Sequence, residues 1–158
     1  MYKRALIPLD GSPVAETILP FILDIAGPLD IEVVLLRVLP PVTPMVIEGS
    51  RHVVIEDEEA RRADAEEYLA PLAVDLRNKG VRVETRVHHG MPAAEIVAAA
   101  REAQADLIAM TTHGRSGLRR LMFGSVAEAV LRHSDIPVFL LRATEAQVAG
   151  RAARERVP

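Results

Sequence analysis

The sequence predicts an α/β fold with a five-stranded parallel sheet sandwiched between helices, in the strand order 3-2-1-4-5. Two observations predict it. Apolar runs alternate with amphipathic segments along the chain, and strands that alternate with helices form parallel sheets through right-handed crossovers. Several of these runs are nearly continuous, which is typical of strands covered on both faces. The chain has 158 residues, of which 49% are apolar, enough for one domain with a substantial core.

The first part of the chain predicts two strands with a helix between them. Arg4–Leu9 is a short apolar run that ends in a turn. Ser12 is placed to cap the following helix, because Pro13 is favoured at the first helical position. Apolar residues at helical spacing extend this helix over Val14–Ala26, and the β-branched run Ile31–Leu39 is the second strand.

The middle of the chain predicts a loop, two helices and an edge strand. Prolines exclude regular structure from Val42–Ile55, which we expect to be a mobile loop. Glu56–Asn78 has the apolar spacing of a long amphipathic helix. Val81–Val87 alternates apolar or Thr residues with charged ones, which predicts a strand near a sheet edge. The next helix is expected over Ala93–Ala103.

A glycine-containing loop separates the fourth strand from its helix. Ala105–Thr111 reads as a buried strand, and the loop after it holds three glycines, the last being Gly124. A helix then begins at Ser125, which has the spacing of a capping box to Glu128. Glycines and the free N–H groups of a helix N-terminus together hold phosphate. We interpret this segment as the phosphate half of a nucleotide site; the alternative is a plain connection with glycines at tight turns.

The last strand is predicted over Ile136–Arg142, and the domain is expected to span residues 1–142. The tail from 143 to 158 presents no convincing core face, so we expect a frayed helix or a disordered segment.

Composition excludes several classes of function. A net charge of −3 gives no electrostatic reason to expect nucleic acid as a partner. The chain has no cysteine, which excludes disulfides and thiolate sites. An apolar stretch of about twenty residues is absent, so no membrane span is expected. Pro8 and Asp10 interrupt the first apolar run too early for a signal peptide. We expect a soluble, cytoplasmic domain.

Two chain segments are expected to converge on one crevice. In a doubly wound sheet the ligand lies beyond the carboxyl ends of the strands, where the strand order reverses. If the first and fourth strands are central neighbours, Asp10 and Thr111 flank this point. Asp10 is able to accept hydrogen bonds from an adenine amino group or a ribose hydroxyl, or to form an Asx-turn. Val38 ends the second strand, where its backbone would meet a purine edge or its side chain would simply belong to the core.

Further polar residues near the glycine loop have open roles. Arg115, Arg119 and Arg120 are placed to neutralise phosphates or to form a solvated basic patch. His113 would bond a ligand or orient the loop. The Walker A and G-x-G-x-x-G patterns are absent, and Leu118 breaks a nucleophile elbow.

No other catalytic or metal arrangement is forced by the sequence. His88 and His89 are adjacent on a strand and point to opposite faces, so they are a poor metal pair. Ser-His-Asp and paired-carboxylate constellations are not indicated either.

Four separated motifs, in order and at matching spacing, resemble those of the universal stress protein family over Met1–Arg142. They are Leu6–Ser12 (LIPLDGS), Leu36–Val38 (LRV), Gly90–Ala93 (GMPA), and Thr112–Gly117 (THGRSG) followed by Gly124–Ala127 (GSVA). The resemblance implies a Rossmann-like fold similar to that of the adenine nucleotide alpha hydrolases.

The ATP-binding branch of this family is marked by G-x2-G-x9-G-[ST]. Gly114 and Gly124-Ser125 match its second part, whereas Thr111 stands at the first glycine. A β-branched side chain there would crowd the ribose, unless the backbone is ordinary extended strand, in which case the hydroxyl is able to bond the sugar.

Site residues, cofactors and partners follow from the resemblance. It implies that Asp10 and Val38 hold adenine and that ATP or another adenylate binds with Mg²⁺ on its phosphates. The implied cofactor-binding residues are Pro8, Asp10, Val38, Thr111, His113, Gly114, Arg115, Ser116, Gly117, Gly124, Ser125 and Val126. It also implies a homodimer through the last strand, at Pro137, Val138, Phe139, Leu140 and Leu141.

The expected function is that of an ATP-binding, nucleotide-dependent regulator of the stress response, with at most slow ATPase activity. The alternative is a dimeric stress-response interaction module that does not bind nucleotide, with Thr111 as the cause.

Overall fold

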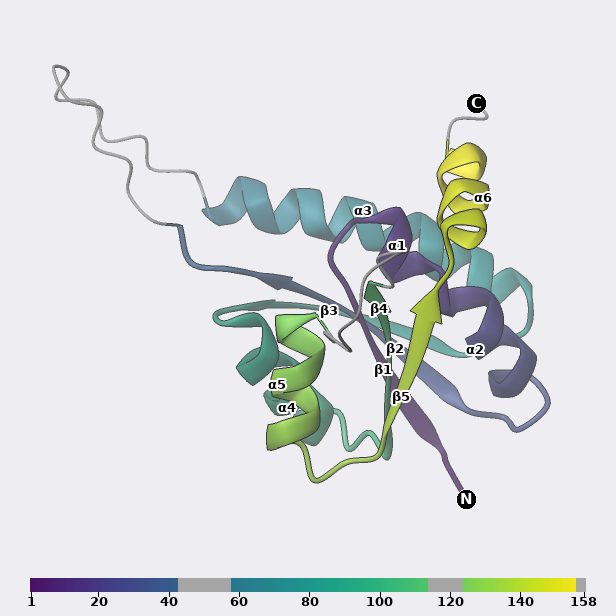
Figure 1. Ribbon diagram of the computed structural model, residues 1–158, viewed down its shortest axis with the longest axis horizontal. Helices are drawn as coiled ribbons and strands as arrows, with labels where there is room; N and C mark the ends of the chain where they lie inside the picture. Colours follow the sequence, from purple (N-terminus) through teal and green to yellow (C-terminus); the bar gives the residue numbers. More distant parts are fainter. Residues whose placement is uncertain (43–57, 114–123, 156–158) are drawn as a thin grey trace, which may run out of the picture.

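Five parallel strands form one sheet in the order β3-β2-β1-β4-β5, as the sequence predicts (Figure 1). The computed structural model describes residues 1–42, 58–113 and 124–155. The strands are β1 (Arg4–Leu9), β2 (Glu32–Leu39), β3 (Val83–His89), β4 (Leu107–His113) and β5 (Val138–Ala143). The helices are α1 (Pro13–Glu16), α2 (Ile18–Ala26), α3 (Glu58–Asn78), α4 (Pro92–Glu102), α5 (Ser125–His133) and α6 (Glu145–Glu155).

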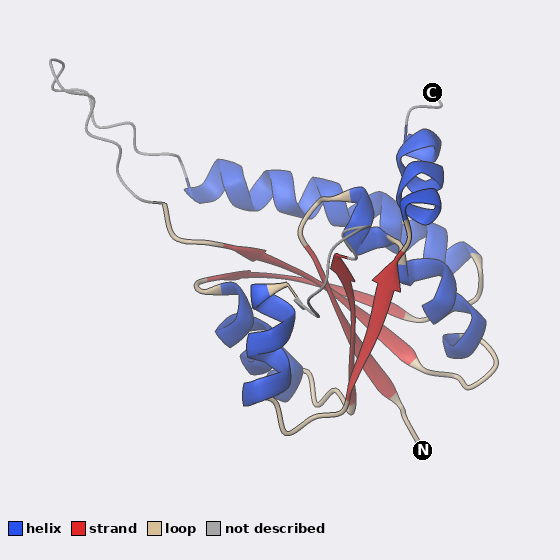
Figure 2. Ribbon diagram, viewed as in Figure 1, coloured by secondary structure: helices blue, strands red, loops and turns tan. Residues whose placement is uncertain are grey.

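Helices cover both faces of the sheet (Figure 2). Side chains alternate between the two faces along a strand. In β1, Ile7 therefore packs toward α2 and α3, whereas Leu6 packs toward α4 and α5. In β2, Leu35 and Leu36 divide in the same way. Both faces need apolar residues, which explains why these two strands read as continuous apolar runs.

The helix predicted over Val14–Ala26 is two helices, because the chain breaks between α1 and α2 at Thr17. Pro20 has no N–H to donate to the carbonyl of Glu16, and its ring crowds that carbonyl. The N–H of Thr17 instead closes a tighter turn onto the Val14 carbonyl, at 3.1 Å. Ser12 is the N-cap of α1 as predicted, accepting the Ala15 N–H at 3.1 Å.

Strand β3 lies at a sheet edge, as its alternating pattern predicts, but begins two residues later than expected. The delay comes from the end of α3. Gly80 has a φ of +85°, and the Val81 N–H returns to the Leu76 carbonyl at 3.1 Å, so this segment closes the helix before the strand starts.

The C-terminal segment is helical from Glu145 to Glu155. This helix has an anchor that the sequence pattern did not indicate. Arg151 Nε lies 2.6 Å from Oε2 of Glu16, with side-chain exposures of 19% and 2%. Helix α6 therefore packs against α1. Within the described ranges, no helix is long and apolar enough to cross a membrane.

Candidate functional site

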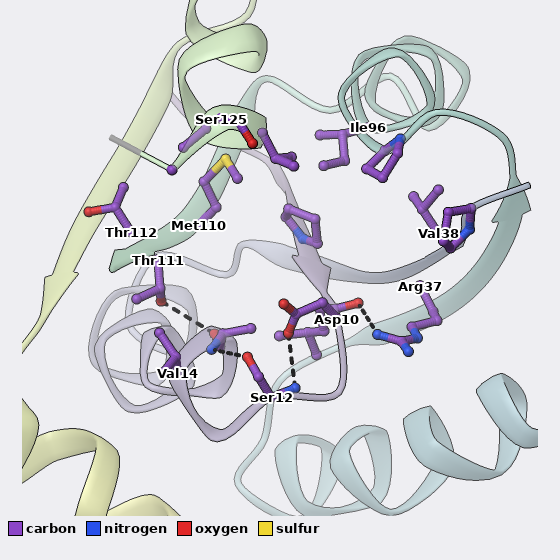
Figure 3. Close-up of a pocket in the computed structure, with 18 residues that line it drawn as sticks. Asp10, Ser12, Val14, Arg37, Val38, Ile96, Met110, Thr111, Thr112 and Ser125 are labelled. Carbon is purple, nitrogen blue, oxygen red and sulfur yellow. Dashed lines mark hydrogen bonds between the residues drawn. The ribbon is translucent and has the colours of Figure 1, made fainter. Parts of the chain in front are cut away.

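A cavity of about 530 Å³ opens at the carboxyl edge of the sheet, at the ends of the neighbouring strands β1 and β4, which pair further back through Ala5–Leu6 and Leu107–Ile108 (Figure 3). The chain leaves β1 toward β2 and reaches β4 from β3, so this is the point where the strand order reverses. Seven predicted site residues line the cavity: Pro8, Asp10, Val38, Thr111, Gly124, Ser125 and Val126. The side chain of His113 and residues Gly114, Arg115, Ser116 and Gly117 lie outside the described part of the chain, as do Arg119, Arg120 and the predicted loop beyond residue 42.

Asp10 stands exposed at the end of β1. Its Oδ1 accepts the N–H of Ser12 at 2.9 Å, which is the Asx-turn alternative. Among the described residues, none donates to its Oδ2. One carboxylate oxygen therefore fixes the turn, and the other is available to a ligand in the cavity.

Gly11 makes the turn after Asp10 possible. Its φ is +84°, a conformation that other residues rarely adopt, and an added Cβ would lie 3.4 Å from Nη1 of Arg37. The glycine thus allows Arg37 to pack closely beneath the turn.

Arg37 is a cavity residue that the site prediction missed, although it belongs to one of the quoted motifs. Its guanidinium lies over the ring of Tyr68, 5.7 Å from the centroid, and Nη1 is 3.5 Å from the carbonyl oxygen of Leu9. A single arginine in the otherwise apolar run 33–39 of β2 is the signal that could have found it. Its neighbour Val38 lines the cavity and also packs against the core, and contact with a purine edge stays a prediction.

Thr111 is held by helix α1 (Figure 3). Its Oγ1 donates to the carbonyl of Ala15 at 3.3 Å and lies 3.3 Å from Oγ1 of Thr17. Because Thr111 belongs to β4, its backbone is an extended strand, where a β-branched residue is well accommodated. The hydroxyl is directed toward α1.

The start of α5 forms another wall of the cavity. The predicted capping box is wrong: Gly124 is the N-cap and Ser125 is already the first helical residue, while the Glu128 carboxylate pairs with Arg132 at 2.7 Å. No side chain of the described residues caps this helix. Its first N–H groups, those of Ser125 and Val126 included, therefore lack intrahelical acceptors at the positive end of the helix dipole.

The space around Gly124 is open. An added Cβ would meet no atom of the described residues within 4 Å, and the backbone φ of −54° suits any residue. Neither the backbone conformation nor the described neighbours therefore require glycine here, and it leaves room in the cavity at the start of α5.

Behind the cavity lies a polar pair formed by the buried Glu16 and the partly buried Tyr68. The hydroxyl of Tyr68 donates to Oε1 of Glu16 at 2.7 Å. Burial, followed by this hydrogen bond to a carboxylate, raises the pKa of Tyr68 far above its usual value. Tyr68 is therefore a neutral donor at any physiological pH.

Metal-binding clusters are not found in the described residues. The side chains of His88 and His89 differ in exposure, as expected for neighbours on a strand: His88 is partly buried and His89 is exposed. His88 Nδ1 lies 3.1 Å from Oε2 of Glu95 and its Nε2 lies 3.6 Å from Oε2 of Glu102. Neither histidine lines the cavity.

Comparison with known proteins places these features in a family. The model of the universal stress protein family matches residues 1–142. Universal stress protein MJ0531 of Methanocaldococcus jannaschii is 35% identical over 145 residues, covering 90% of this chain and 83% of its own. A Bacillus subtilis relative, universal stress protein YxiE, is 29% identical over 148 residues, covering 90% of this chain and all of its own.

Solved structures agree with this fold. That of protein MJ0577 superposes with a TM-score of 0.69 at 25% identity, covering 92% of this chain and 99% of its own. A universal stress protein from Archaeoglobus fulgidus in complex with dAMP has a TM-score of 0.62 at 25% identity, covering 88% of this chain and 97% of its own. With the family motifs, the strand order and the cavity in agreement, this chain belongs to the universal stress protein family.

Proposed function

We propose that this chain is an ATP-binding universal stress protein that acts as a nucleotide-dependent regulator of the stress response. One observation carries the proposal: the cavity beyond the ends of β1 and β4 is lined by the N-terminus of α5, which no side chain of the described residues caps. Such a terminus attracts phosphate groups through its N–H donors and its dipole. The complex of the Archaeoglobus fulgidus relative with dAMP supports an adenylate as the ligand.

The cavity residues suggest how the nucleotide would lie. The free Oδ2 of Asp10 would accept a hydrogen bond from the adenine amino group beside Val38. Pro8 and Thr111 would lie near the ribose, and the helix start at Gly124 would receive the phosphates. A volume of about 530 Å³ lies within the range of small-molecule sites. Mg²⁺ would be carried by the phosphate oxygens.

Gly124 offers a charge test with little structural cost. We expect the Gly124→Asp variant to fold normally, because its Cβ enters open space and Asp is a good N-cap. Its carboxylate would repel phosphate, so ATP-Mg²⁺ affinity measured by calorimetry should fall about tenfold or more. The matched control is Gly124→Asn, which has the same shape and capping ability without the charge. It should bind ATP more tightly than the Asp variant and more weakly than the wild type, because its amide oxygen competes with phosphate for the helix N–H groups.

Absence of saturable binding to the wild type below about 1 mM, which corresponds to about −4 kcal/mol, would refute the proposal. Equal affinities of the Asp and Asn variants would contradict the placement of the phosphates.

A second candidate is the dimeric interaction module that binds no nucleotide. Among the described residues β5 pairs with β4 alone, so it is an edge strand, and Phe139 on it is 41% exposed. An exposed apolar edge strand favours pairing with a second copy. We propose a homodimer through Pro137–Leu141, which is compatible with either function.

A further inference from the structure

Glu16 is a buried carboxylate that no step of nucleotide binding uses. The residue is 1% exposed, and both of its oxygens are occupied. Oε1 accepts the Tyr68 hydroxyl at 2.7 Å, and Oε2 pairs with Arg151 Nε at 2.6 Å. A charge so deeply buried is tolerated only when it is paired and hydrogen-bonded. The position of α6 is therefore tied to that of Glu16.

Glu16 belongs to α1, and α1 is a wall of the cavity. Val14 and Ala15 line the cavity on one side of this helix, while Glu16 points into the polar pair behind it. A helix of four residues has almost no stability of its own, so its position depends on tertiary contacts. The Thr111 hydroxyl holds the Ala15 carbonyl from the cavity side, and Arg151 with Tyr68 holds Glu16 from behind.

Tyr68 extends this connection to the adenine end of the cavity. The guanidinium of Arg37 packs over its ring and lies beneath the turn at Gly11, near the Leu9 carbonyl. The Glu16 carboxylate thus fixes the phenol, and the phenol supports the side chain under the turn that presents Asp10.

We propose that Arg151, on α6, is a positioning residue for the nucleotide pocket and acts through Glu16 on α1. The inference rests on the proposed function, because it concerns how tightly the pocket holds an adenine nucleotide. Helix α6 lies beyond residues 1–142, which the family model matches. Since coupling between two sites is reciprocal, nucleotide binding must tighten the docking of α6 by the same factor.

The test combines ATP-Mg²⁺ affinity with hydrogen exchange. Arg151→Gln should weaken ATP binding about tenfold, a usual size for coupling between sites, and the amides of Val14–Thr17 should exchange faster. Arg151→Lys, which keeps the charge, should recover part of the affinity. The control Arg62→Gln removes the same charge from an exposed pair with Glu66 on α3 and should change nothing. In the wild type, ATP should slow exchange in α6.

Two failures are distinguishable. If the wild type binds ATP and Arg151→Gln binds equally well, the positioning role is overturned and the proposed function stands. If the wild type binds no nucleotide, the proposed function fails and the inference fails with it. If Arg151→Gln does not fold, hydrogen exchange in the wild type decides. ATP binding that leaves the amide exchange rates of α6 unchanged overturns the inference.

Discussion

At the scale of single residues, Thr111 determines whether the cavity is compatible with an adenylate. The family pattern has glycine here, and a β-branched side chain directed into the cavity would occupy space near the ribose. Its hydroxyl instead contacts Ala15 and Thr17, so the side chain is engaged by α1. The substitution therefore adds a contact between β4 and α1, and the cavity of about 530 Å³ exists with Thr111 in place.

Tyr68 offers a residue-scale prediction about pH. Burial raises its pKa above the ordinary value of about 10 that the unfolded chain has. The contribution of the protonated Tyr68 to the free energy of unfolding is therefore fully present below about pH 10. It is lost as the pH rises above this value, because the phenol then loses its proton readily only in the unfolded chain. In the Tyr2→Phe variant, where Tyr68 is the remaining tyrosine, phenolate absorbance should appear together with unfolding. Phenolate formation near pH 10 in a chain that is still folded would contradict the buried hydrogen bond to Glu16.

At the scale of elements, the connection from β3 to α4 depends on a glycine. Gly90 has a φ of +146°, and a Cβ there would lie 2.7 Å from Oε1 of Glu95. Glu95 is the partner of His88, so any larger residue must displace it. The tight connection brings Pro92, at the start of α4, to the cavity.

Comparison of two glycines tests this connection. Gly80 also has a positive φ, of +85°, but a Cβ there would meet nothing within 4 Å in the described part of the chain. Gly80→Ala should lower the free energy of unfolding by about 1–2 kcal/mol from backbone strain alone. Gly90→Ala should lower it further, because Glu95 must also leave His88. Urea denaturation measures both, and an equal loss in the two variants would mean that the contact with Glu95 contributes nothing.

The same scale separates what could be predicted from the sequence and what could not. Strands β1 and β2 were predictable because a strand that is buried on both faces has a nearly continuous run of apolar residues. Asp10, Val38 and Thr111 could be predicted to lie together because the carboxyl ends of neighbouring parallel strands meet at one edge of the sheet, and all three line the cavity. The break at Thr17 was also open to prediction, because Pro20 cannot donate to the Glu16 carbonyl. The shift of the cap from Ser125 to Gly124 was not, because the sequence allows either residue to begin the helix.

Contacts between distant segments were beyond the sequence pattern. Arg151 and Glu16 are 135 positions apart, and neither residue type predicts its partner. Arg37 on Tyr68 is a contact of the same kind, made between β2 and α3.

At the scale of the whole molecule, β5 presents the sheet edge opposite to β3. Phe139 is 41% exposed on this edge, whereas Phe21, at 38%, lies on helix α2 and not on a strand. Phe139→Glu should shift the chain from dimer to monomer in analytical ultracentrifugation, because a charge at a paired apolar edge is costly. Phe21→Glu is the matched control and should leave the sedimentation unchanged. A dimer that persists in Phe139→Glu would exclude the proposed interface.

The central claim is that the carboxyl edge of the sheet, between β1 and β4, receives an adenine nucleotide. A crystal structure grown with excess ATP and Mg²⁺ tests it most directly. We predict the purine beside Val38 with its amino group on Asp10, and phosphate oxygens on the N–H groups at Gly124 and Ser125. A structure in which the ligand is at saturating concentration and this cavity holds none of it would contradict the account.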